Sequence, residues 1–325
     1  MKKRLMRVLL VSVITALIFI FALAAIIKCS PPVQPAPLES VIAPFQSMDF
    51  SQLPPLRSFV ARDGEKLAYQ AYLSSAPAAK TVVLIHGSSG SGTMMHALAG
   101  YLREQERVDV YVPDVRGHGQ SGKRGDIAYI GQLEDDLEDF IHAVLKDRAD
   151  LTLVGFSSGG GFALRFAASD RQNYFDRYIL LAPFIRYDAP TTRPENNKWV
   201  NASVPRIIGI SLLGPIGEKY FGHLPVLAFG VDSQNVQHQT SVYSYRLWKN
   251  FGAHHNYKAD LKNALKPIAV MVGYDDELFY PQKFLPVFAE EQPHAEITIV
   301  PNVGHISMIT DKTGLAAISE NIFID

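Results

Sequence analysis

Cysteine is nearly absent from this chain of 325 residues, since Cys29 is the only one. An intramolecular disulfide is therefore excluded, and so is a cysteine nucleophile in a domain that folds after Cys29. Net charge is nearly absent too, at −1, and no basic run lies beyond the extreme N-terminus. Nothing in the charge pattern therefore supports binding to nucleic acid. The composition, 47% apolar and 19% charged, suits one large α/β domain with an insertion, or two smaller domains.

Long apolar runs are missing except near the N-terminus, where Val8 to Ile27 could cross a hydrocarbon core of about 30 Å as a helix. Basic residues precede this run, and such positive flanks stay cytoplasmic. Residues 1–29 therefore predict an uncleaved membrane anchor that leaves the rest of the chain outside the cytoplasm. A cleaved signal peptide with a secreted product is the alternative, because Ala22-Leu23-Ala24 offers an A-x-A site. The proline-rich stretch that follows predicts an extended linker over 30–55 that holds the domain off the membrane.

A glycine-flanked serine organises the globular part of the sequence. Gly155-Phe156-Ser157-Ser158-Gly159 fits the nucleophile elbow G-x-S-x-G, in which a serine sits on a sharp turn between a strand and a helix. The context agrees, because the apolar run 151–154 predicts a buried strand and 162–168 predicts a helix. Glycine suits the flanking positions, since a Cβ there would collide with the adjoining strand and helix. For this motif alone, a glycine-rich turn without a catalytic role is the alternative.

A second glycine-rich segment follows the predicted central strand 81–85. His86-Gly87-Ser88-Ser89-Gly90-Ser91-Gly92 can point backbone N–H groups into the crevice where α/β sheets bind ligands. A phosphate-binding loop does not fit, because there is no Gly-Lys-Ser/Thr ending and G-x-G-x-x-G is not matched. Before this strand, 57–61 and 67–73 predict an antiparallel hairpin around an Asp-Gly turn.

The segment after the next predicted strand is Asp114-Val115-Arg116-Gly117-His118-Gly119-Gln120-Ser121. This D-x-R-G-H-G-x-S pattern, the His-Gly loop and the elbow together closely resemble the α/β-hydrolase superfamily. The resemblance is greatest to its monoacylglycerol lipase, lysophospholipase and serine aminopeptidase-like branch, and it covers the chain from about residue 56 to the end. It implies an α/β-hydrolase fold with a mostly parallel central sheet flanked by helices. It also implies that Arg116 and His118 belong to a structural loop rather than to catalysis.

The same resemblance implies how the chain is divided. The hydrolase core would comprise 56–184 and 262–325, with a helical cap inserted over 185–261. The regular alternation of strands and helices does stop near Ile185, where the sequence becomes rich in proline, glycine, asparagine and aromatic residues. The large apolar residues of the insertion are expected either to line the substrate pocket or to form the core of the cap: Trp199, Ile207, Ile208, Ile210, Leu212, Leu213, Phe221, Leu224 and Phe229.

The catalytic acid and base are expected after the last two predicted strands. In the resembled family the acid follows the pattern G-x-x-D-x-hydrophobic, which Asp276 matches. Asp275 is one residue early, and Asp188, after an earlier strand, is a further alternative. His305 stands in a Gly-His pair before the final predicted helix. The order Ser157, Asp276, His305 is the one typical of this fold.

These residues predict a serine hydrolase that cleaves a carboxylic ester through an acyl-enzyme intermediate. The oxyanion would be held by the backbone N–H groups of Ser158 and, by resemblance, of Ser88. An apolar cap and a membrane tether favour a lipid-like ester, a monoacylglycerol or a lysophospholipid. A serine aminopeptidase of the same fold is an alternative, with Glu195 and Glu218 as candidate partners for a free amine. A non-catalytic binding module is the alternative of a different class.

This chemistry requires no cofactor, and the sequence predicts no metal site. The acidic residues of the helix expected over 129–146 are interpreted as a solvated face near its N-terminus, where negative charge suits the helix dipole. They are Glu134, Asp135, Asp136, Glu138 and Asp139. The histidines of the insertion have no spacing that places ligands on a common helix face, and are interpreted as surface residues. They are His223, His238, His254 and His255.

Overall fold

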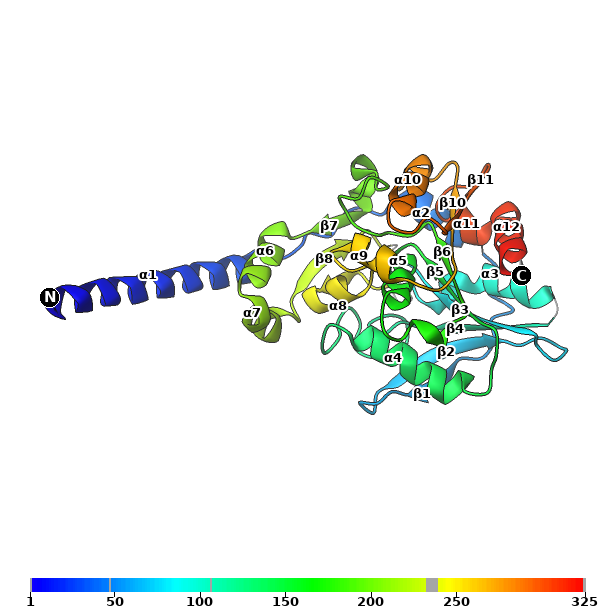
Figure 1. The fold of residues 1–325 in the computed structure, drawn as a ribbon, viewed down its shortest axis with the longest axis horizontal. Helices are drawn as coiled ribbons and strands as arrows, with labels where there is room; N and C mark the ends of the chain where they lie inside the picture. Colours follow the sequence, from blue (N-terminus) through cyan, green and yellow to red (C-terminus); the bar gives the residue numbers. More distant parts are fainter. Residues whose placement is uncertain (1, 47, 106, 232–238, 324–325) are drawn as a thin grey trace.

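The computed structural model describes residues 2–46, 48–105, 107–231 and 239–323, apart from the side chains of residues 2, 42 and 195–197. An eight-stranded sheet lies at its centre (Figure 1). From one edge to the other, its strands are β1 (Arg57–Val60), β2 (Lys66–Tyr72), β4 (Val108–Pro113), β3 (Lys80–Ile85), β5 (Leu151–Phe156), β6 (Arg177–Leu181), β10 (Ile268–Gly273) and β11 (Glu296–Val300).

The sheet is parallel from β4 to β11, and only β1 and β2 run antiparallel to their neighbours. The predicted hairpin at the edge is therefore confirmed, and Gly64 in its turn has a φ of 87°. The central strands are buried along their whole length, which explains why they are continuous apolar runs rather than alternating ones. The mostly parallel sheet predicted from the sequence is present.

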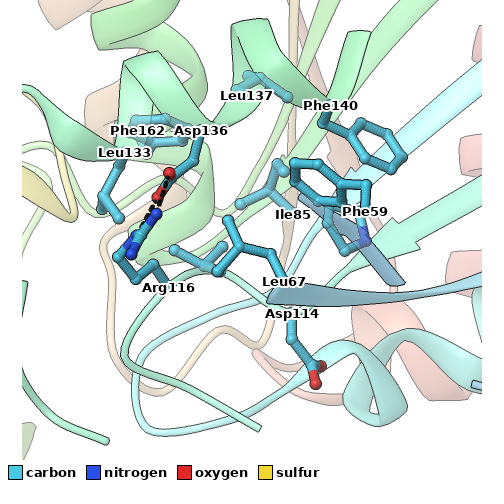
Figure 2. A pocket seen from close by; sticks show the side chains of 12 residues that line it. Phe59, Leu67, Ile85, Asp114, Arg116, Leu133, Asp136, Leu137, Phe140 and Phe162 are labelled. Atoms are coloured by element: carbon cyan, nitrogen blue, oxygen red, sulfur yellow. Dashed lines mark hydrogen bonds and ion pairs between the residues drawn. The ribbon is translucent and has the colours of Figure 1, made fainter. Parts of the chain in front are cut away.

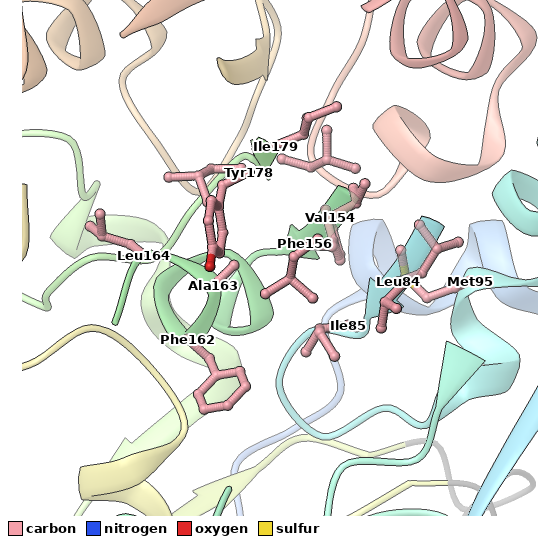
Figure 3. Packing of buried hydrophobic residues seen from close by; sticks show 14 of the residues in the cluster. Leu84, Ile85, Met95, Val154, Phe156, Phe162, Ala163, Leu164, Tyr178 and Ile179 are labelled. Carbon is pink, nitrogen blue, oxygen red and sulfur yellow. The ribbon is translucent and has the colours of Figure 1, made fainter. Parts of the chain in front are cut away.

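Helices cover both faces of the sheet. On one face α4, α5 and α9 pack together, and on the other α3 packs against α11 and α12. Figure 3 shows Phe156 of β5 between α5, which contributes Phe162 and Leu164, and Leu84 of β3. The bounds are α3 (His96–Glu104), α4 (Gln132–Phe140), α5 (Ser158–Ala167), α9 (Tyr257–Asn263), α10 (Phe284–Ala289), α11 (Ser307–Thr310) and α12 (Lys312–Phe323), with short helical turns η1 (Gly92–Met95), η2 (Ile141–Leu145), η3 (Gln172–Tyr174) and η6 (Pro281–Lys283).

A second, smaller unit lies in the chain between β6 and α9. Its three strands form an antiparallel sheet of their own, in the order β7, β8, β9. We call residues 185–261 the inserted segment. That this segment is a separate domain with these limits stays a prediction. Its elements are η4 (Pro194–Trp199), β7 (Val200–Ala202), α6 (Val204–Leu212), α7 (Gly214–Phe221), β8 (Pro225–Phe229), β9 (Val242–Ser244) and α8 (Tyr245–Asn250).

The N-terminal helix α1 (Lys2–Cys29) projects away from the body of the molecule and meets it only at its last turns (Figure 1). There Leu23 and Ile27 are buried against α6 of the inserted segment. Arg206 donates hydrogen bonds to the carbonyl oxygens of Ile27, at 2.6 Å, and of Lys28, at 3.2 Å. A cation at the carbonyl end of a helix is favourable because it opposes the helix dipole.

The linker predicted over 30–55 does not behave as an extended spacer. It contains a helix, α2 (Glu39–Gln46), and its first residues run along the inserted segment, where the N–H of Val33 donates to the side chain of Asn201 at 2.9 Å. Leu38, Val41 and Phe45 pack against the core. The prediction of a free spacer is therefore wrong, because apolar residues within the proline-rich stretch find a surface to bury.

The sequence predicts a solvated acidic face on α4, but two of its carboxylates are buried and paired with arginine. Glu134 is buried, accepting from Arg165 at 2.5 Å and from Asn250 at 2.6 Å. Asp136 is buried against Arg116, and Figure 2 shows this ion pair beside a small apolar cavity of about 30 Å³. Burial raises the pKa of Asp136 to about 6, although the arginine opposes this. These carboxylates therefore tie α4 to neighbouring segments through arginine.

Candidate active site

Ser157 occupies the turn between β5 and α5 with a φ of 54° and a ψ of −117°. Positive φ is costly for a residue with a side chain, so the surroundings must enforce it. They do so through the backbone: the N–H of Ser157 donates to Leu181 at 2.9 Å, and its carbonyl accepts from Gly161 at 3.1 Å and Phe184 at 2.9 Å. The loop after β6 thus holds the serine in its strained conformation.

The glycines of the motif are required by close approach of the backbone. A Cβ on Gly159 would lie 2.4 Å from the carbonyl oxygen of His86, and one on Gly155 would lie 2.2 Å from the carbonyl oxygen of Gly159. Backbone atoms on both sides leave no room for a side chain to be accommodated. The steric reason inferred from the sequence is present in the structure.

His305 and Asp276 lie side by side although 29 residues separate them in the chain. Nδ1 of His305 is 2.9 Å from Oδ2 of Asp276, and both side chains are almost fully buried. The second carboxylate oxygen accepts N–H groups from Leu278 and Phe279, each at 2.9 Å. With its Nδ1–H donated to a fixed carboxylate, the imidazole keeps Nε2 as an acceptor.

The two rival aspartates lie elsewhere. Asp275 has an exposed side chain, and its backbone N–H donates to the carbonyl oxygen of Val303 at 3.0 Å. Asp188 accepts a hydrogen bond from Arg186 at 2.9 Å, and its side chain is 45% exposed. Among the three candidates, Asp276 is the one that contacts His305.

The ring of His305 is packed between two aromatic residues. The ring centroid of Phe156 is 4.8 Å away, and that of Phe279 is 5.2 Å away. The backbone N–H of His305 donates to a carboxylate oxygen of Glu277 at 2.8 Å. Sequence reasoning did not single out Glu277; its position directly after Asp276 is the signal that could have drawn attention to it.

Ser157 and His305 line one small cavity of about 20 Å³. Its other walls come from separate parts of the chain: the linker, the loop and helical turn after β3, the end of β5, the inserted segment, and the loops after β10 and β11. The remaining lining residues are Val41, Gly87, Ser88, Met94, Phe156, Trp199, Leu278 and Ile306. The structure therefore brings three of the predicted residues, Ser88, Ser157 and His305, to one space.

Ser88 and Ser158, the predicted oxyanion residues, are neighbours. Their hydroxyl groups hydrogen-bond to each other, and a Cβ on Gly87 would lie 3.2 Å from that of Ser157. Ser158 is the first residue of α5, and the first N–H groups of a helix have no partner within it. The two predicted oxyanion residues thus lie beside each other close to Ser157, and Ser158 stands at the positive end of a helix dipole.

A chain of buried hydrogen bonds fixes the loop that carries Ser88. The N–H of Ser89 donates to the hydroxyl of Tyr243 at 2.6 Å, and that hydroxyl lies 2.6 Å from Nε2 of His118. Nδ1 of His118 faces the carbonyl oxygens of Val115 and Arg116, so the tyrosine O–H donates to Nε2. Burial lowers the pKa of His118 well below its usual value and raises that of Tyr243, which keeps both groups neutral.

In this arrangement His118 has the structural role expected from the sequence. Tyr243 also has a structural role, because its hydroxyl joins His118 to the loop after β3. Tyr243 belongs to β9, far along the chain from the motifs, and no sequence motif marks it as a residue of the site. Thr240, three residues earlier, also bonds the same loop: its N–H donates to the carbonyl of Ser89 at 2.7 Å. The inserted segment therefore holds the loop after β3 in place.

No group of three or more metal-ligating side chains that could hold a metal ion occurs among the described residues. Of the predicted surface histidines, His254 bonds Asp260 at 2.7 Å, and His238 lies outside the described residues. The side chain of Glu195 also lies outside them. Glu218, on α7, is not among the described residues that line the cavity.

Residues 76–311 match the sequence profile of the family described as serine aminopeptidase, S33. The chain belongs to this family of α/β-hydrolases. The resemblance to the α/β-hydrolase superfamily, in the branch that includes the serine aminopeptidases, is therefore confirmed. An uncharacterised protein of Mycobacterium tuberculosis is 33% identical over 130 residues, which are 40% of this chain and 35% of that protein. The chain thus spans about a third of the length of the curated relatives it matches.

Solved structures share the fold at low identity. A soluble variant of monoglyceride lipase from Saccharomyces cerevisiae, in complex with a substrate analogue, has a TM-score of 0.65 and 20% identity over 84% of this chain and 96% of its own. A membrane phospholipase A described as a bacterial virulence factor has a TM-score of 0.57 and 18% identity, and it covers 99% of this chain and 98% of its own. The second likeness therefore extends over the region of α1 as well.

Proposed function

We propose that the protein is a serine hydrolase that cleaves a carboxylic ester of a lipid-like substrate, with Ser157, His305 and Asp276 as its catalytic residues. The observation that carries the proposal is the hydrogen bond between His305 and Asp276, because the imidazole that it orients lines the same cavity as a strained serine at a strand-to-helix turn. Membership of a hydrolase family supports the same reaction class.

In this mechanism Nε2 of His305 accepts the proton of the Ser157 hydroxyl as its oxygen attacks the ester carbonyl. Asp276 holds the imidazole in the required tautomer and stabilises the imidazolium. The tetrahedral intermediate collapses when His305 returns the proton to the departing alcohol. Water then repeats the sequence on the acyl-enzyme, which releases the carboxylic acid and restores the serine.

The negative charge on the carbonyl oxygen is held by the backbone N–H groups of Ser88 and Ser158. Such donors act because they are already oriented before the charge develops, and losing one typically costs about 3 kcal/mol in the barrier. Since main chain supplies them, replacement of the Ser88 side chain by alanine has only a small effect in this account. The position of the loop matters more than the identity of its side chain.

A lipid-like substrate is favoured by the apolar surface near the end of α1. Val204, Ile208 and Leu212 lie four residues apart and form one exposed stripe on α6. Ile216 and Tyr220 are exposed on α7, and this helix lies close to the end of α1 (Figure 1). Exposed apolar patches of this kind mark contact with a membrane or a partner. Helix α1 is long and apolar enough to cross a membrane, which suits an anchored protein as well as a cleaved signal sequence.

We therefore place the protein at the outer face of the cytoplasmic membrane, with α1 as the anchor and the apolar stripe against the lipid. The fold likeness over 99% of the chain to a structure described as a membrane phospholipase A supports this placement. Secretion after cleavage at Ala22-Leu23-Ala24 is the alternative. The apparent mass of the mature protein in the membrane fraction distinguishes the two.

A serine aminopeptidase is the second candidate, favoured by the description of the family that matches residues 76–311. The test is a panel of monoacylglycerols, lysophospholipids and aminoacyl anilides, assayed with wild type and Ser157→Ala. We expect turnover of one of the lipid esters and its loss in the variant. Preferred hydrolysis of aminoacyl anilides would replace the lipid proposal, and turnover that survives in Ser157→Ala would overturn the assignment of the nucleophile.

A further inference from the structure

Helix α2 presents one apolar face to the hydrolase core. Leu38, Val41 and Phe45 follow one another at intervals of three and four residues, which places them along one side of the helical segment. All three pack against the core, whereas Glu39 and Ser40 are exposed on the other side. The linker is therefore docked through a defined apolar stripe.

Contacts before and after α2 hold it in this position. Upstream of α2, the side chain of Gln34 donates a hydrogen bond to the carbonyl oxygen of Phe229. The backbone of Ala36 also passes close to Gly230: a Cβ on Gly230 would lie 2.2 Å from the carbonyl oxygen of Ala36. Downstream, Gln70 of β2 donates to the carbonyl of Pro54 at 3.2 Å. Helix α2 is thus strapped between the inserted segment and the hydrolase core.

Helix α2 forms part of the wall of the cavity beside Ser157. Val41 lines it together with Ser157 and His305, and among the described residues it is the one from the linker that does so. Trp199 of the inserted segment and Met94 are further apolar walls. A volume of about 20 Å³ is of the order needed for a single water, whereas pockets for organic ligands usually enclose several hundred Å³. The space beside the serine is therefore limited by these side chains, Val41 among them.

We propose that Val41 is a specificity-determining residue, which limits the size of the acyl group that fits beside Ser157; this rests on the function proposed above. The wall that selects the substrate is then supplied by the segment that follows the anchor. A smaller side chain at this position enlarges the space for the acyl chain. A larger one fills it and discriminates against long chains more than against an acetyl group.

The experiment uses the full chain in detergent micelles and compares Val41→Ala and Val41→Trp with wild type. The readout is the ratio of kcat/KM for p-nitrophenyl decanoate to that for p-nitrophenyl acetate. We expect the ratio to rise about tenfold in Val41→Ala, because a change of one or two methyl groups in an apolar pocket is worth about that much. In Val41→Trp the ratio should fall, because the larger side chain fills the space for the acyl chain. Val41→Ala keeps the test decisive if the tryptophan variant does not fold.

Ser40→Ala and Ser40→Trp are the matched controls, since Ser40 is the exposed neighbour on the same helix. Both should keep the wild-type ratio. A ratio that does not change in Val41→Ala, in protein that a fluorophosphonate still labels, would overturn the inference and leave the proposed function intact. Wild-type protein that neither labels nor turns over acetate would overturn the proposed function and, with it, this inference.

Discussion

Two regions of the molecule meet at the catalytic cavity, and they are built on different principles. The strand-end region consists of Ser157, Asp276 and His305, each placed in the turn or loop that follows a parallel strand of one sheet. The covering region consists of the linker with Val41 and the inserted segment with Trp199 and Tyr243. In the first, local backbone geometry positions each side chain; in the second, packing between distant segments does so.

This difference explains why substitutions in the two regions have different effects. The backbone of a strand-end residue is constrained by its turn and by the adjoining strands. For Ser157 these constraints are the hydrogen bonds with Gly161, Leu181 and Phe184 and the close contacts at the flanking glycines. A covering residue is constrained only by what it touches, so its substitution alters space or position without removing the reacting group. The strand-end region therefore defines the chemistry in this account, and the covering region tunes it.

The largest effect is expected from the acid. Asp276→Asn should lower kcat on the order of 10⁴-fold, because the amide no longer holds His305 in the tautomer that can accept a proton. Asp275→Asn is the matched control and should keep nearly full activity, since its side chain is exposed. Steady-state turnover of a p-nitrophenyl ester by both variants provides the measurement. A severe loss in Asp275→Asn with a mild one in Asp276→Asn would move the acid by one residue.

A steric change in the strand-end region should be the next most damaging. Gly159→Ala places a Cβ 2.4 Å from the carbonyl of His86, so the elbow or the neighbouring strand must shift. We expect a loss of several kcal/mol in the free energy of unfolding, within the range seen for severe core substitutions. The comparison is Gly100→Ala in α3, where a Cβ meets nothing within 4 Å and helix propensity favours alanine. Thermal unfolding of the two variants checks this, and equal melting temperatures would refute the steric account.

In the covering region, Tyr243→Phe should have a smaller effect directed at kcat. It leaves the buried N–H of Ser89 without its acceptor, at a cost of about 1–3 kcal/mol, and frees the loop that carries Ser88. We expect kcat to fall about tenfold with KM little changed, since the loop positions a donor used in the transition state. Tyr245→Phe, which loses a bond to Ser211 in the same segment, should lower stability without lowering kcat. The same kcat in both variants would show that Tyr243 is only structural.

The smallest expected effect is a pH dependence of stability that arises from His118. Its pKa is lowered by burial, so below the usual value of 6.5 the unfolded chain binds a proton that the folded chain does not. Stability should therefore fall as pH drops below about 6.5, by at most about 1.4 kcal/mol per pH unit. Asp136, with a pKa raised to about 6, makes the folded state more stable as the pH falls, which opposes the effect of His118. Because Asp136 is present in wild type and in the variant below, its contribution is the same in both.

His118→Gln isolates this contribution, because glutamine keeps a neutral acceptor for Tyr243 and does not titrate. Melting temperatures of wild type and variant, measured from pH 8 to pH 5, should converge as the pH falls. Parallel curves would mean that His118 is not held neutral by the fold.

The strand-end region could be anticipated from the sequence because each of its motifs describes one turn and its flanking strand. The elbow around Ser157, the G-x-x-D pattern at Asp276 and the Gly-His pair at His305 are local patterns of this kind. The hairpin at Gly64 and the parallel sheet followed from apolar runs and turn signals in the same way.

The covering region could not be anticipated, since its contacts join residues far apart in the chain. Val41 lies more than a hundred residues from Ser157, and the bond between Ser89 and Tyr243 spans 154 residues. The proline-rich composition of the linker predicts a spacer, although three of its apolar side chains pack against the core. Ile208 and Leu212, expected in a pocket or a core, are 53% and 64% exposed.

The acidic run on α4 shows the same limit of local patterns. Its composition predicts a solvated face, but its arginine partners lie on other elements and cannot be located from the helix sequence alone.

The most direct test of the central claim is to locate the covalent adduct formed by a fluorophosphonate. Intact protein is labelled, digested and analysed by mass spectrometry, alongside Ser157→Ala and His305→Ala. The account predicts a single adduct on the peptide that contains Ser157, its absence in Ser157→Ala, and strongly slowed formation in His305→Ala. An adduct on a different serine, or labelling that persists in Ser157→Ala, would contradict it.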